Sequence, residues 1–551
     1  MNTSLSSVIR RTLLAAALLV PAGGALAADE RQSLEELRNT VINLLQALVD
    51  QGVITREKAE QMVKNAQEKA AANAQATAKQ DEGAVRVPYV PDIVKDEIAK
   101  QVAEQVKPQV VAGVVQEAKA EKWGVPGALA DWLTRTRLSG SVTLRGEDVM
   151  FAKDNDKVAY LNYYAINQAG SFTKAGVNAY ENTTVDRARF RGRFRLAVDS
   201  DITDWLSAGA RVVTGNTSDL VSETQTLDGT APYQFGLDEL FIRIDERNSQ
   251  RFPWLSVVGG RFLNPYGTPT DLVFHKDLTF EGIAITGRLG FGDGSAEQSH
   301  LFLTLGAHPI QEVALSSHDK YLTGAQLGAN LRWGEGQHLR VAAAFFDYFN
   351  VTGRLNPPND DSHIYDYTAP QYERQGNTYY NISNSPDYDL WALASKYREG
   401  NVSISYELPV GPYSFGLTAD AVRNFGFNTA QVAALVGPFP VQPVRRRVNG
   451  YQAEASFGTP TVLSLGAWRA VFGYRYLQAD AVLDAYTDSD FHWGGTNALG
   501  YYFVGDVGIA PRTWVRLRYL SANAIDPPPL VFGPTFNLGI DTVQLDLNTR
   551  F

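Results

Sequence analysis

The chain has 551 residues and a formal net charge of −10, from 50 lysines and arginines against 60 aspartates and glutamates. It contains no cysteine, which excludes a disulfide scaffold, a thiolate zinc site, an iron–sulfur cluster and a cysteine nucleophile. A chain of this length holds about two to four ordinary domains, or one large barrel with an appendage.

Residues 1–27 have the layout of a secretory signal. Arg10 and Arg11 precede an apolar run over residues 12–20, and Ala25-Leu26-Ala27 provides an A-x-A cleavage site. The apolar run is shorter than the ~20 residues that a membrane-spanning helix needs, so a membrane anchor is the disfavoured alternative. We therefore expect a signal peptide and an exported protein.

Residues 28–79 predict a helical coiled-coil segment. Its apolar residues recur at alternating spacings of three and four, the pattern of a coiled-coil seam. One helix cannot bury this seam alone, so we expect the same segment of sister subunits to pack against it, as an oligomerisation helix of a homotrimer. A charged spacer without this role is the alternative. The seam residues are Leu34, Leu37, Val41, Leu44 and Leu48.

A change of period divides the rest of the chain. Residues 80–91 read as a linker, because Pro88 and Pro91 forbid continuous helix there. Residues 92–136 predict a further helical segment. From residue 137 to 551, segments of about ten residues alternate between apolar and polar positions, which is typical of the strands of a transmembrane β-barrel.

The barrel segments number sixteen, and their connections alternate between short and long. Closure of an up-and-down barrel needs an even number of strands, with both ends on the side of the short turns. We therefore treat residues 389–408 as one long strand with a bulge or kink at Gly400, and eighteen strands are the alternative. The segments are residues 137–148, 185–199, 204–215, 235–245, 254–263, 278–289, 300–307, 322–333, 338–349, 389–408, 413–424, 448–458, 466–477, 499–509, 513–522 and 538–551.

The second segment indicates which face meets water. An arginine on the lipid face costs ~2–4 kcal/mol at mid-membrane, so its row of arginines must face a lumen, which in a sixteen-stranded barrel is a water-filled channel. A nucleic-acid partner is not expected, because the chain is acidic and exported. The arginines of this row are Arg187, Arg189, Arg191, Arg193 and Arg195.

Further arginines fall on the polar faces of neighbouring segments. Because the first and last strands of a closed barrel are adjacent, most of these arginines extend the same wall, and the sequence predicts an arginine-rich lumen. These pore-lining candidates are Arg145, Arg211, Arg469, Arg475, Arg516, Arg518 and Arg550.

The long link after the fifth segment begins with Asn264-Pro265-Tyr266-Gly267 and carries acids. We expect it to fold inward, so that Asp271, Asp277 and Glu281 face the arginines and create a transverse field that selects by charge and dipole. The alternative is that these acids lie on an exposed loop.

The last segment places Val543, Leu545, Leu547 and Phe551 on one face. With the signal peptide, the N-terminal helix, the linker at residues 87–91 and the motif at residues 260–265, this ending resembles that of proteobacterial outer-membrane proteins known as putative porins, which carry a periplasmic helical segment before a barrel. The resemblance covers nearly the full length. Many general porins begin their barrel close to the mature N-terminus, whereas this chain does not.

The resemblance implies passive diffusion of small hydrophilic solutes and ions, homotrimers in outer-membrane lipid, and an N-terminal segment in the periplasm. It also implies that the barrel-assembly machinery reads the terminal residues. It does not name a solute.

Two other classes of function were weighed. The sequence has no G-x-S-x-G, H-E-x-x-H or G-x-x-x-x-G-K motif, and its seven histidines lack the spacing of metal ligands. We therefore expect no enzyme, metal or cofactor, with an outer-membrane hydrolase as a minor alternative. The other alternative is an envelope tether, whose helices bind peptidoglycan or a periplasmic partner while the barrel is an anchor.

Overall fold

The computed structural model describes residues 61, 64, 65, 68, 134–156, 160–215, 220–221, 224–230, 232–292, 298–314, 316–358, 362–437, 444–526 and 537–551. The expected signal peptide, coiled-coil seam, linker and most of the second helical segment therefore lie outside the described residues. The chain divides into two units, Met1–Glu117 and Ala118–Phe551, and the fold below is that of the second. Among the described residues, no helix is long and apolar enough to cross a membrane.

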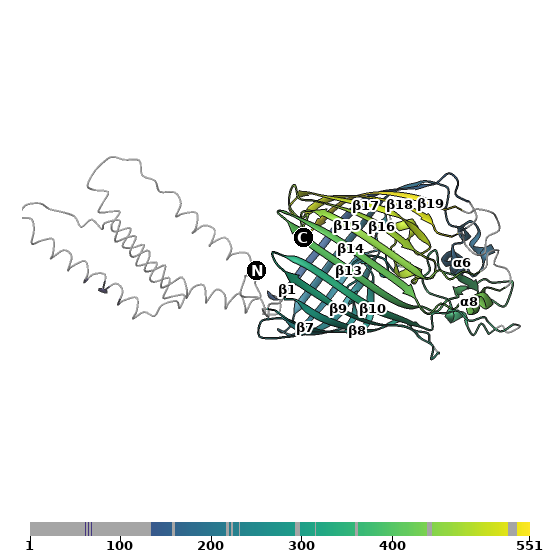
Figure 1. Ribbon diagram of the computed structural model, residues 1–551, viewed down its shortest axis with the longest axis horizontal. Helices are drawn as coiled ribbons and strands as arrows, with labels where there is room; N and C mark the ends of the chain where they lie inside the picture. Colours follow the sequence, from purple (N-terminus) through teal and green to yellow (C-terminus); the bar gives the residue numbers. More distant parts are fainter. Residues whose placement is uncertain are drawn as a thin grey trace, which may run out of the picture. The chain divides into compact units, whose positions relative to one another are not determined.

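Sixteen antiparallel strands form a closed barrel (Figure 1). The sheet contains seventeen strands, of which the two-residue β4 (Gln225–Thr226) adds only to β2. The wall closes because β1 (Thr136–Phe151) pairs with both β2 (Arg187–Asp201) and β19 (Gly539–Arg550). The expected fold class is confirmed, and the alternative of eighteen strands is wrong.

The remaining wall strands follow in chain order, each paired with the next. They are β3 (Leu206–Thr214), β5 (Phe235–Arg247), β6 (Pro253–Leu263), β7 (Thr279–Gly290), β8 (His300–Gln311), β9 (Lys320–Trp333), β10 (Gln337–Phe349), β13 (Arg398–Val410), β14 (Tyr413–Asn424), β15 (Asn449–Gly458), β16 (Trp468–Leu477), β17 (Ala498–Ala510) and β18 (Thr513–Ala524).

Alternation along the strands explains why they form a barrel. Large apolar side chains such as Leu240, Ile242, Leu327, Val402 and Leu545 are exposed on the outer face, where lipid would cover them. Successive side chains of a strand point to opposite faces, so the polar residues between them face the lumen. One face of each strand is thus suited to lipid and the other to water.

The connections between strands are short at one end of the barrel and mostly long at the other. Short turns lie at the end where the last residue, Phe551, exchanges backbone hydrogen bonds with Gly140 of β1, and the C-terminus marks this end in Figure 1. The other end carries eight loops. We name them L1 (152–186), L2 (215–234), L3 (264–278), L4 (312–319), L5 (350–397), L6 (425–448), L7 (478–497) and L8 (525–538), of which all but L4 are longer than the turns.

The loops hold the remaining short elements, among them α6 and α8, which mark the long-loop end in Figure 1. L1 contains α6 (Tyr163–Ala169), α7 (Phe172–Ala175) and η1 (Gly176–Ala179). L5 contains η2 (Asp366–Thr368), β11 (Tyr379–Asn381) and β12 (Trp391–Leu393). L6 contains α8 (Thr429–Val436), and L7 contains η3 (Asp484–Tyr486) and η4 (Phe491–Trp493).

The expected long strand over residues 389–408 is wrong. β13 begins at Arg398, and the earlier part of this segment lies in L5, where β12 pairs with β11. The expected bulge at Gly400 is also wrong, because Gly400 pairs in unbroken register with Phe345 and Arg423. Its missing side chain instead leaves room for the ring of Phe425, which a Cβ there would touch at 2.7 Å.

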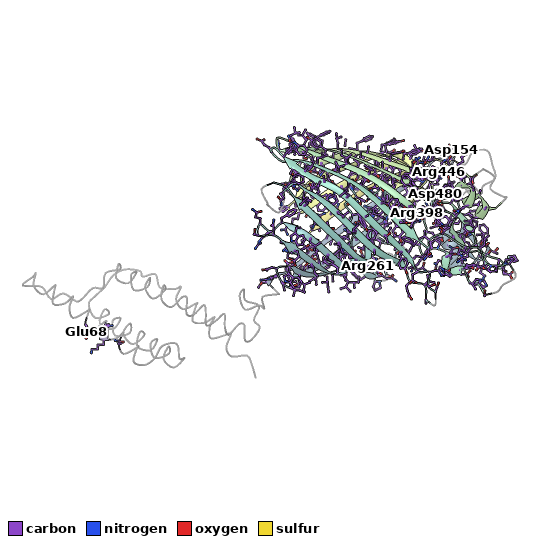
Figure 2. All side chains as sticks on the ribbon, turned by 60° about the horizontal axis from the view of Figure 1, so that its bottom comes forward. Glu68, Asp154, Arg261, Arg398, Arg446 and Asp480 are labelled. Atoms are coloured by element: carbon purple, nitrogen blue, oxygen red, sulfur yellow. The ribbon has the colours of Figure 1, made fainter. Side chains whose placement is uncertain are left out.

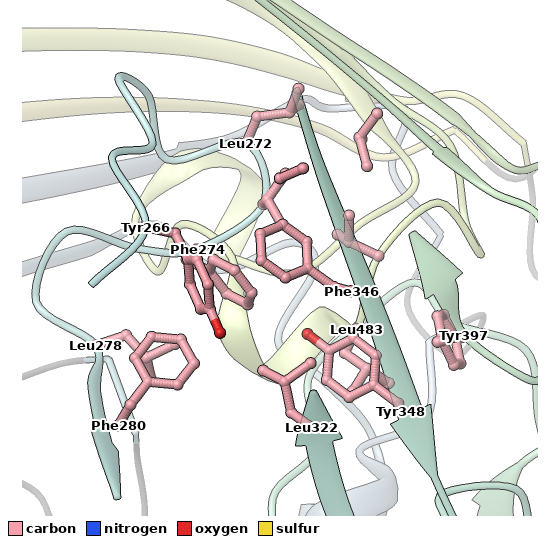
Figure 3. Close-up of a cluster of buried hydrophobic side chains, with 14 of the residues drawn as sticks. Tyr266, Leu272, Phe274, Leu278, Phe280, Leu322, Phe346, Tyr348, Tyr397 and Leu483 are labelled. Carbon is pink, nitrogen blue, oxygen red and sulfur yellow. The ribbon is translucent and has the colours of Figure 1, made fainter. Parts of the chain in front are cut away.

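The largest buried cluster lies inside the barrel, where L3 folds onto the wall (Figure 3). Tyr266 and Phe274 of L3 make edge-to-face contacts with Phe346 of β10, at centroid distances of 5.0 and 4.9 Å. Such contacts add about 0.5–1.5 kcal/mol each beyond the burial of apolar area. An aromatic anchor therefore holds L3 in the lumen.

A pit in the wall receives Tyr266. Gly306 of β8 and Gly324 of β9 lie directly opposite each other, and a Cβ on either would overlap the Tyr266 hydroxyl. That hydroxyl lies 3.0 Å from Nε2 of His308. The two glycines are thus required for the close approach of L3 to the wall.

Candidate functional site: the lumen constriction

The inner face of β2, β1, β19 and β18 carries a wall of arginines. Arg191 pairs in register with Arg145, Arg145 with Asp546, and Asp546 with Arg516. Directly opposite strand neighbours lie ~4.5–5.5 Å apart, so these side chains form one charged row across four strands. We call the following set the arginine wall: Arg145, Arg189, Arg191, Arg193, Arg195, Arg516 and Arg518.

Acids on the same strands and on the neighbouring β17 hold part of this wall in place. Asp546 accepts two hydrogen bonds from Arg145, at 2.7 and 3.0 Å, and Asp506 accepts two from Arg516, at 2.7 and 3.0 Å. Glu147 pairs with Arg189 at 2.5 Å and Arg191 at 3.3 Å. Bidentate pairs fix a guanidinium in direction as well as in position.

L3 brings Asp277 against the other side of the wall. Its carboxylate oxygens lie 3.1 Å from Nη1 of Arg193 and 2.7 Å from Nη2 of Arg195. Burial alone would raise the pKa of Asp277, but the charge of Arg195 and smaller contributions from neighbouring cations outweigh it and hold the pKa below its ordinary value. Asp277 therefore stays ionised and tied to two arginines.

L7 supplies a second acid that sequence reasoning missed. Asp490 lies 3.1 Å from Arg145, 2.6 Å from Arg518 and 3.9 Å from Arg191. Burial opposes ionisation, but these three charges, with Arg145 the largest, hold the pKa of Asp490 well below its ordinary value. One loop carboxylate thus joins arginines from three strands.

The neighbouring acid of L7, Asp488, faces a different strand. It pairs at 3.2 Å with Arg475, whose Nε donates to Gln452 at 2.7 Å. The charge of Arg475 outweighs burial and lowers the pKa of Asp488. Two acids in Asp488-Ser489-Asp490, close to the apolar run at residues 481–483, were the signal that could have revealed a second inward loop.

L5 clamps L7 from the long-loop end. Thr378 donates to Asp480 through its backbone N and its hydroxyl, at 2.9 and 2.7 Å, and Tyr379 donates its hydroxyl to Asp484 at 2.9 Å. Burial raises the pKa of Asp484 to about 7, although hydrogen bonds from Tyr379 and neighbouring backbone oppose the shift. L7 is therefore held by buried acids on one side and by ion pairs on the other.

L3 and L7 also touch each other. The backbone N of His275 donates to the carbonyl of Tyr486 at 2.8 Å, and the hydroxyl of Thr487 donates to the carbonyl oxygens of Asp271 and Leu272 at 2.9 and 3.1 Å. The two loops therefore form one continuous partition opposite the arginine wall.

Two cavities lie on either side of this partition. Asp490 lines a cavity of about 670 Å³, which also exposes Arg187, Arg189 and Arg374. Asp488 lines a second cavity of about 480 Å³, together with Asp271, Lys276, Arg469, Arg516, Arg518 and Arg550. Residues 488–490 thus lie where the linings of the two cavities meet, with Asp488 in one lining and Ser489 and Asp490 in the other.

The other candidate arginines contact other groups. Arg211 pairs with Asp238 and Glu239. Arg469 donates to the Ser456 hydroxyl at 3.0 Å. Arg550 stacks over the ring of Trp514, with 5.2 Å from Cζ to the centroid.

Two expected constriction acids lie elsewhere. Glu281 is on β7 between inward-facing Phe280 and Gly282, so it points to the outer face, where it pairs with Arg261 at 2.8 Å; Arg261 is labelled in Figure 2. The expectation failed because a strand begins two residues before Glu281, and alternation then turns it outward. Asp271 is in L3 but caps the backbone N of Lys276 at 2.8 Å instead of meeting the arginine wall.

The terminal residues expected to carry the assembly signal lie on the outer face of β19. Leu545 and Leu547 are exposed there, and Val543 alternates with buried Thr542 and Gln544. Phe551 is also exposed, and its ring covers the Cα of Gly140.

In the part of the chain that the structure describes, no three His, Cys, Asp or Glu residues are grouped so that they could hold a metal ion. A family model described as "Putative porin" matches residues 38–551. The chain belongs to this porin family. It is accordingly an outer-membrane barrel of the channel-forming type, with its short turns on the periplasmic side and its long loops outside.

Solved structures similar to this porin are outer-membrane proteins of distant sequence. OprB of Pseudomonas putida is 10% identical, with 78% of this chain and 97% of that chain covered and a TM-score of 0.42. The channel DcaP of Acinetobacter baumannii is 9% identical, with 76% and 97% covered and a TM-score of 0.39. OmpF of Salmonella typhi is 9% identical, with 76% and 97% covered and a TM-score of 0.37. Among curated proteins, no match was found.

Proposed function

We propose that this porin forms a water-filled channel for passive diffusion of small hydrophilic solutes and ions, and that it selects them between the arginine wall and the loop acids. The observation that carries the proposal is the placement of Asp277 and Asp490 on inward loops against five arginines of the wall. Fixed opposite charges that meet in a partly dehydrated lumen produce a strong local field.

This arrangement favours anions moderately. At the partition the loop carboxylates offset the arginines that they contact, so the field orients dipoles more than it excludes one sign of charge. In the periplasmic cavity, however, Arg469 bonds a hydroxyl and Arg550 stacks on an aromatic ring. The cavity is lined by five basic side chains against the four acids Asp271, Glu454, Asp488 and Asp506, and this small excess of positive charge raises the local concentration of anions.

Single-channel recording tests the proposal. The mature protein is refolded into a planar bilayer, and the reversal potential is recorded under a salt gradient. Stable current steps with a preference for chloride over potassium are the expected result. Steps with a cation preference would overturn the assigned selectivity, and a folded, heat-modifiable barrel without conductance would overturn the channel itself.

We further propose that the porin assembles as a homotrimer and that the N-terminal helical segment strengthens it from the periplasm. The alternating spacing of Leu34, Leu37, Val41, Leu44 and Leu48 supports this role. Deleting residues 29–80 should lower the temperature at which trimers dissociate while conductance per barrel is unchanged. Trimers of unaltered heat stability would contradict the role in assembly, and loss of peptidoglycan binding in a pull-down would support a tether instead.

A further inference from the structure

A second group of arginines lies across the barrel from the arginine wall, below L3. Arg288 of β7 and Arg340 of β10 both point inward, because they alternate with outward-facing residues such as Leu289 and Val341. The inward side chain between them is Phe302 of β8, whose register partner on β7 is Arg288. No part of the constriction includes these residues.

Arg340 borders an aromatic ring, and Arg288 lies beside that ring in the register of the sheet. The Cζ atom of Arg340 lies 4.7 Å from the centroid of Phe302, and Arg288 occupies the position directly opposite Phe302. Gly328 of β9 makes the arrangement possible, because a Cβ there would overlap the Phe302 ring. The ring can therefore lie over β9, between β7 and β10.

Neither arginine has a carboxylate partner among the described residues. Nη1 of Arg288 donates to the carbonyl of Pro253 at 3.1 Å and to the hydroxyl of Ser256 at 2.8 Å. Nε of Arg340 is buried without a hydrogen-bond partner. The neighbouring acid, Asp245, already accepts from Ser256 at 2.7 Å and pairs with Arg247 at 3.4 Å.

L3 prevents Arg340 from moving away. The backbone of Gly267 passes directly over its guanidinium, and a Cβ on Gly267 would overlap it. Arg340 is thus confined between the loop and the Phe302 ring, and the charge of Arg288 repels its own. Two like charges that are partly removed from water and held near each other are unfavourable until an anion joins them.

From this geometry we propose that Arg288 and Arg340 form a transit site for the carboxylate or phosphate group of an anionic solute, with Phe302 as its apolar floor. Guanidinium groups bind both oxyanions through paired N–H donors. His300 of β8 and His338 of β10 lie nearer the periplasmic mouth on the same inner face, where they add donors toward the exit. The site deepens the proposed channel function and rests on it.

Block of the potassium chloride current by inorganic phosphate, and separately by acetate, tests the site in the full-length refolded protein. Arg288→Gln is the first variant because Arg288 does not touch L3, and Arg288→Gln with Arg340→Gln is the second. We expect the half-blocking concentration to rise about threefold in the single variant and about tenfold in the double variant, as expected for the loss of charge-assisted hydrogen bonds. Arg251→Gln, which removes the same charge from an exposed periplasmic turn, should change it less than twofold.

The outcomes separate the site from the channel. If phosphate and acetate block the variants as they block the wild type, or do not block the wild type at all, the transit site is overturned while the channel stands. If the wild type does not conduct, the channel proposal is overturned first. Block by only one of the two anions would restrict the site to that oxyanion, and a weaker effect of Arg288→Lys than of Arg288→Gln would support recognition of charge at this position. If the double variant fails to fold, Arg288→Gln alone decides.

Discussion

L3 and L7 reach the same wall of arginines by different means. L3 is anchored by aromatic rings, with Tyr266 in a pit between two glycines and Phe274 against Phe346. L7 adds Ala481, Val482 and Leu483 to the same buried cluster. Its polar contacts are made by the acids Asp480 and Asp484, which L5 contacts, and by Asp490 with its ion pair partners. Aromatic anchoring depends little on pH or salt, whereas buried carboxylates depend strongly on pH. The constriction thus combines one loop, L3, whose anchor is insensitive to pH with another, L7, whose attachment depends on pH.

The largest effect is expected where both loops lose their counter-charges at once. Arg191→Glu with Arg193→Glu places new carboxylates beside Asp490 and Asp277, so like charges repel both loops and the wall becomes acidic. We expect the channel to change from a preference for chloride to one for potassium, a shift of about tenfold or more in the permeability ratio.

Reversal potentials measure this change. Arg251→Glu with Arg512→Glu is the matched control, because it makes the same charge change in exposed turns at the periplasmic rim. Unchanged selectivity in the lumen variant, or an equal shift in the control, would remove the arginine wall from the selectivity mechanism.

Single neutralisations should rank the two loops. Asp490→Asn leaves three arginines without their shared acid, whereas Asp277→Asn leaves two. Because an unpaired buried charge is costly and attracts mobile counter-ions, we expect the chloride preference to rise about fivefold for Asp490→Asn and about twofold for Asp277→Asn. The same salt-gradient recording measures both, and the reverse order would show that L3 controls selectivity.

Truncating the anchor should release L3 only. Tyr266→Ala removes a fully buried ring, and such losses cost about 3–5 kcal/mol, so we expect a higher conductance with larger current noise. Tyr266→Phe keeps the ring and loses only the contact with His308, a change of about 1 kcal/mol, and its conductance should remain close to wild type. Equal conductance in wild type and Tyr266→Ala would show that L3 does not limit the passage.

The smallest effect is expected at the clamp of L5 on L7, and it depends on pH. The pKa of Asp484 in the folded protein, about 7, is above its ordinary value of 3.8. The attachment of L7 to L5 is therefore most stable below about pH 4. It loses stability as pH rises toward about 7, by roughly 4 kcal/mol at most. We expect more frequent brief current steps at pH 8 than at pH 5.

Asp484→Asn should reduce this difference, because an amide keeps an acceptor for Tyr379 without carrying charge, while burial also raises the pKa of Asp480 in the same clamp. Tyr379→Phe provides a second variant in which the donor is lost and the acid remains, and it should increase the steps at both pH values. Wild-type recordings that are identical at pH 5 and pH 8 would contradict the assignment of Asp484 as the sensitive group.

The barrel could be predicted because the sequence of each strand alternates between apolar and polar residues, which identifies the strand without knowledge of the rest of the fold. The lipid face tolerates no row of charges, so the arginines from Arg187 to Arg195 showed which face of β2 points into the lumen. The alternation of short and long connections gave the number of strands. The segment at residues 389–397 misled this reasoning because Trp391-Ala392-Leu393 alternates like a wall strand, although it pairs with β11 in L5. Local alternation identifies a strand but not the partner to which it bonds.

The constriction could be predicted only in part from the sequence. L3 could be expected to turn inward, and the structure places Asp277 against Arg193 and Arg195. Glu281 was misplaced because it was grouped with the acids of the inward loop although it lies within the strand expected over residues 278–289, where alternation turns it to the outer face. L7 was missed because its inward course depends on contacts with L5, such as Thr378 to Asp480, between residues about a hundred positions apart that carry no common local pattern.

The two glycines beneath Tyr266 have a consequence for mutational scanning. In a scan that replaces each residue with alanine, nearly every substitution removes atoms, but at Gly306 and Gly324 it adds one into the space of the tyrosine hydroxyl. Here the smallest available substitution is the disruptive one, and it acts on Tyr266, which is 40 positions from Gly306 and 58 from Gly324. The calibre of this pore is thus set in part by atoms that the wall lacks, which a survey restricted to charged or lumen-exposed side chains would overlook.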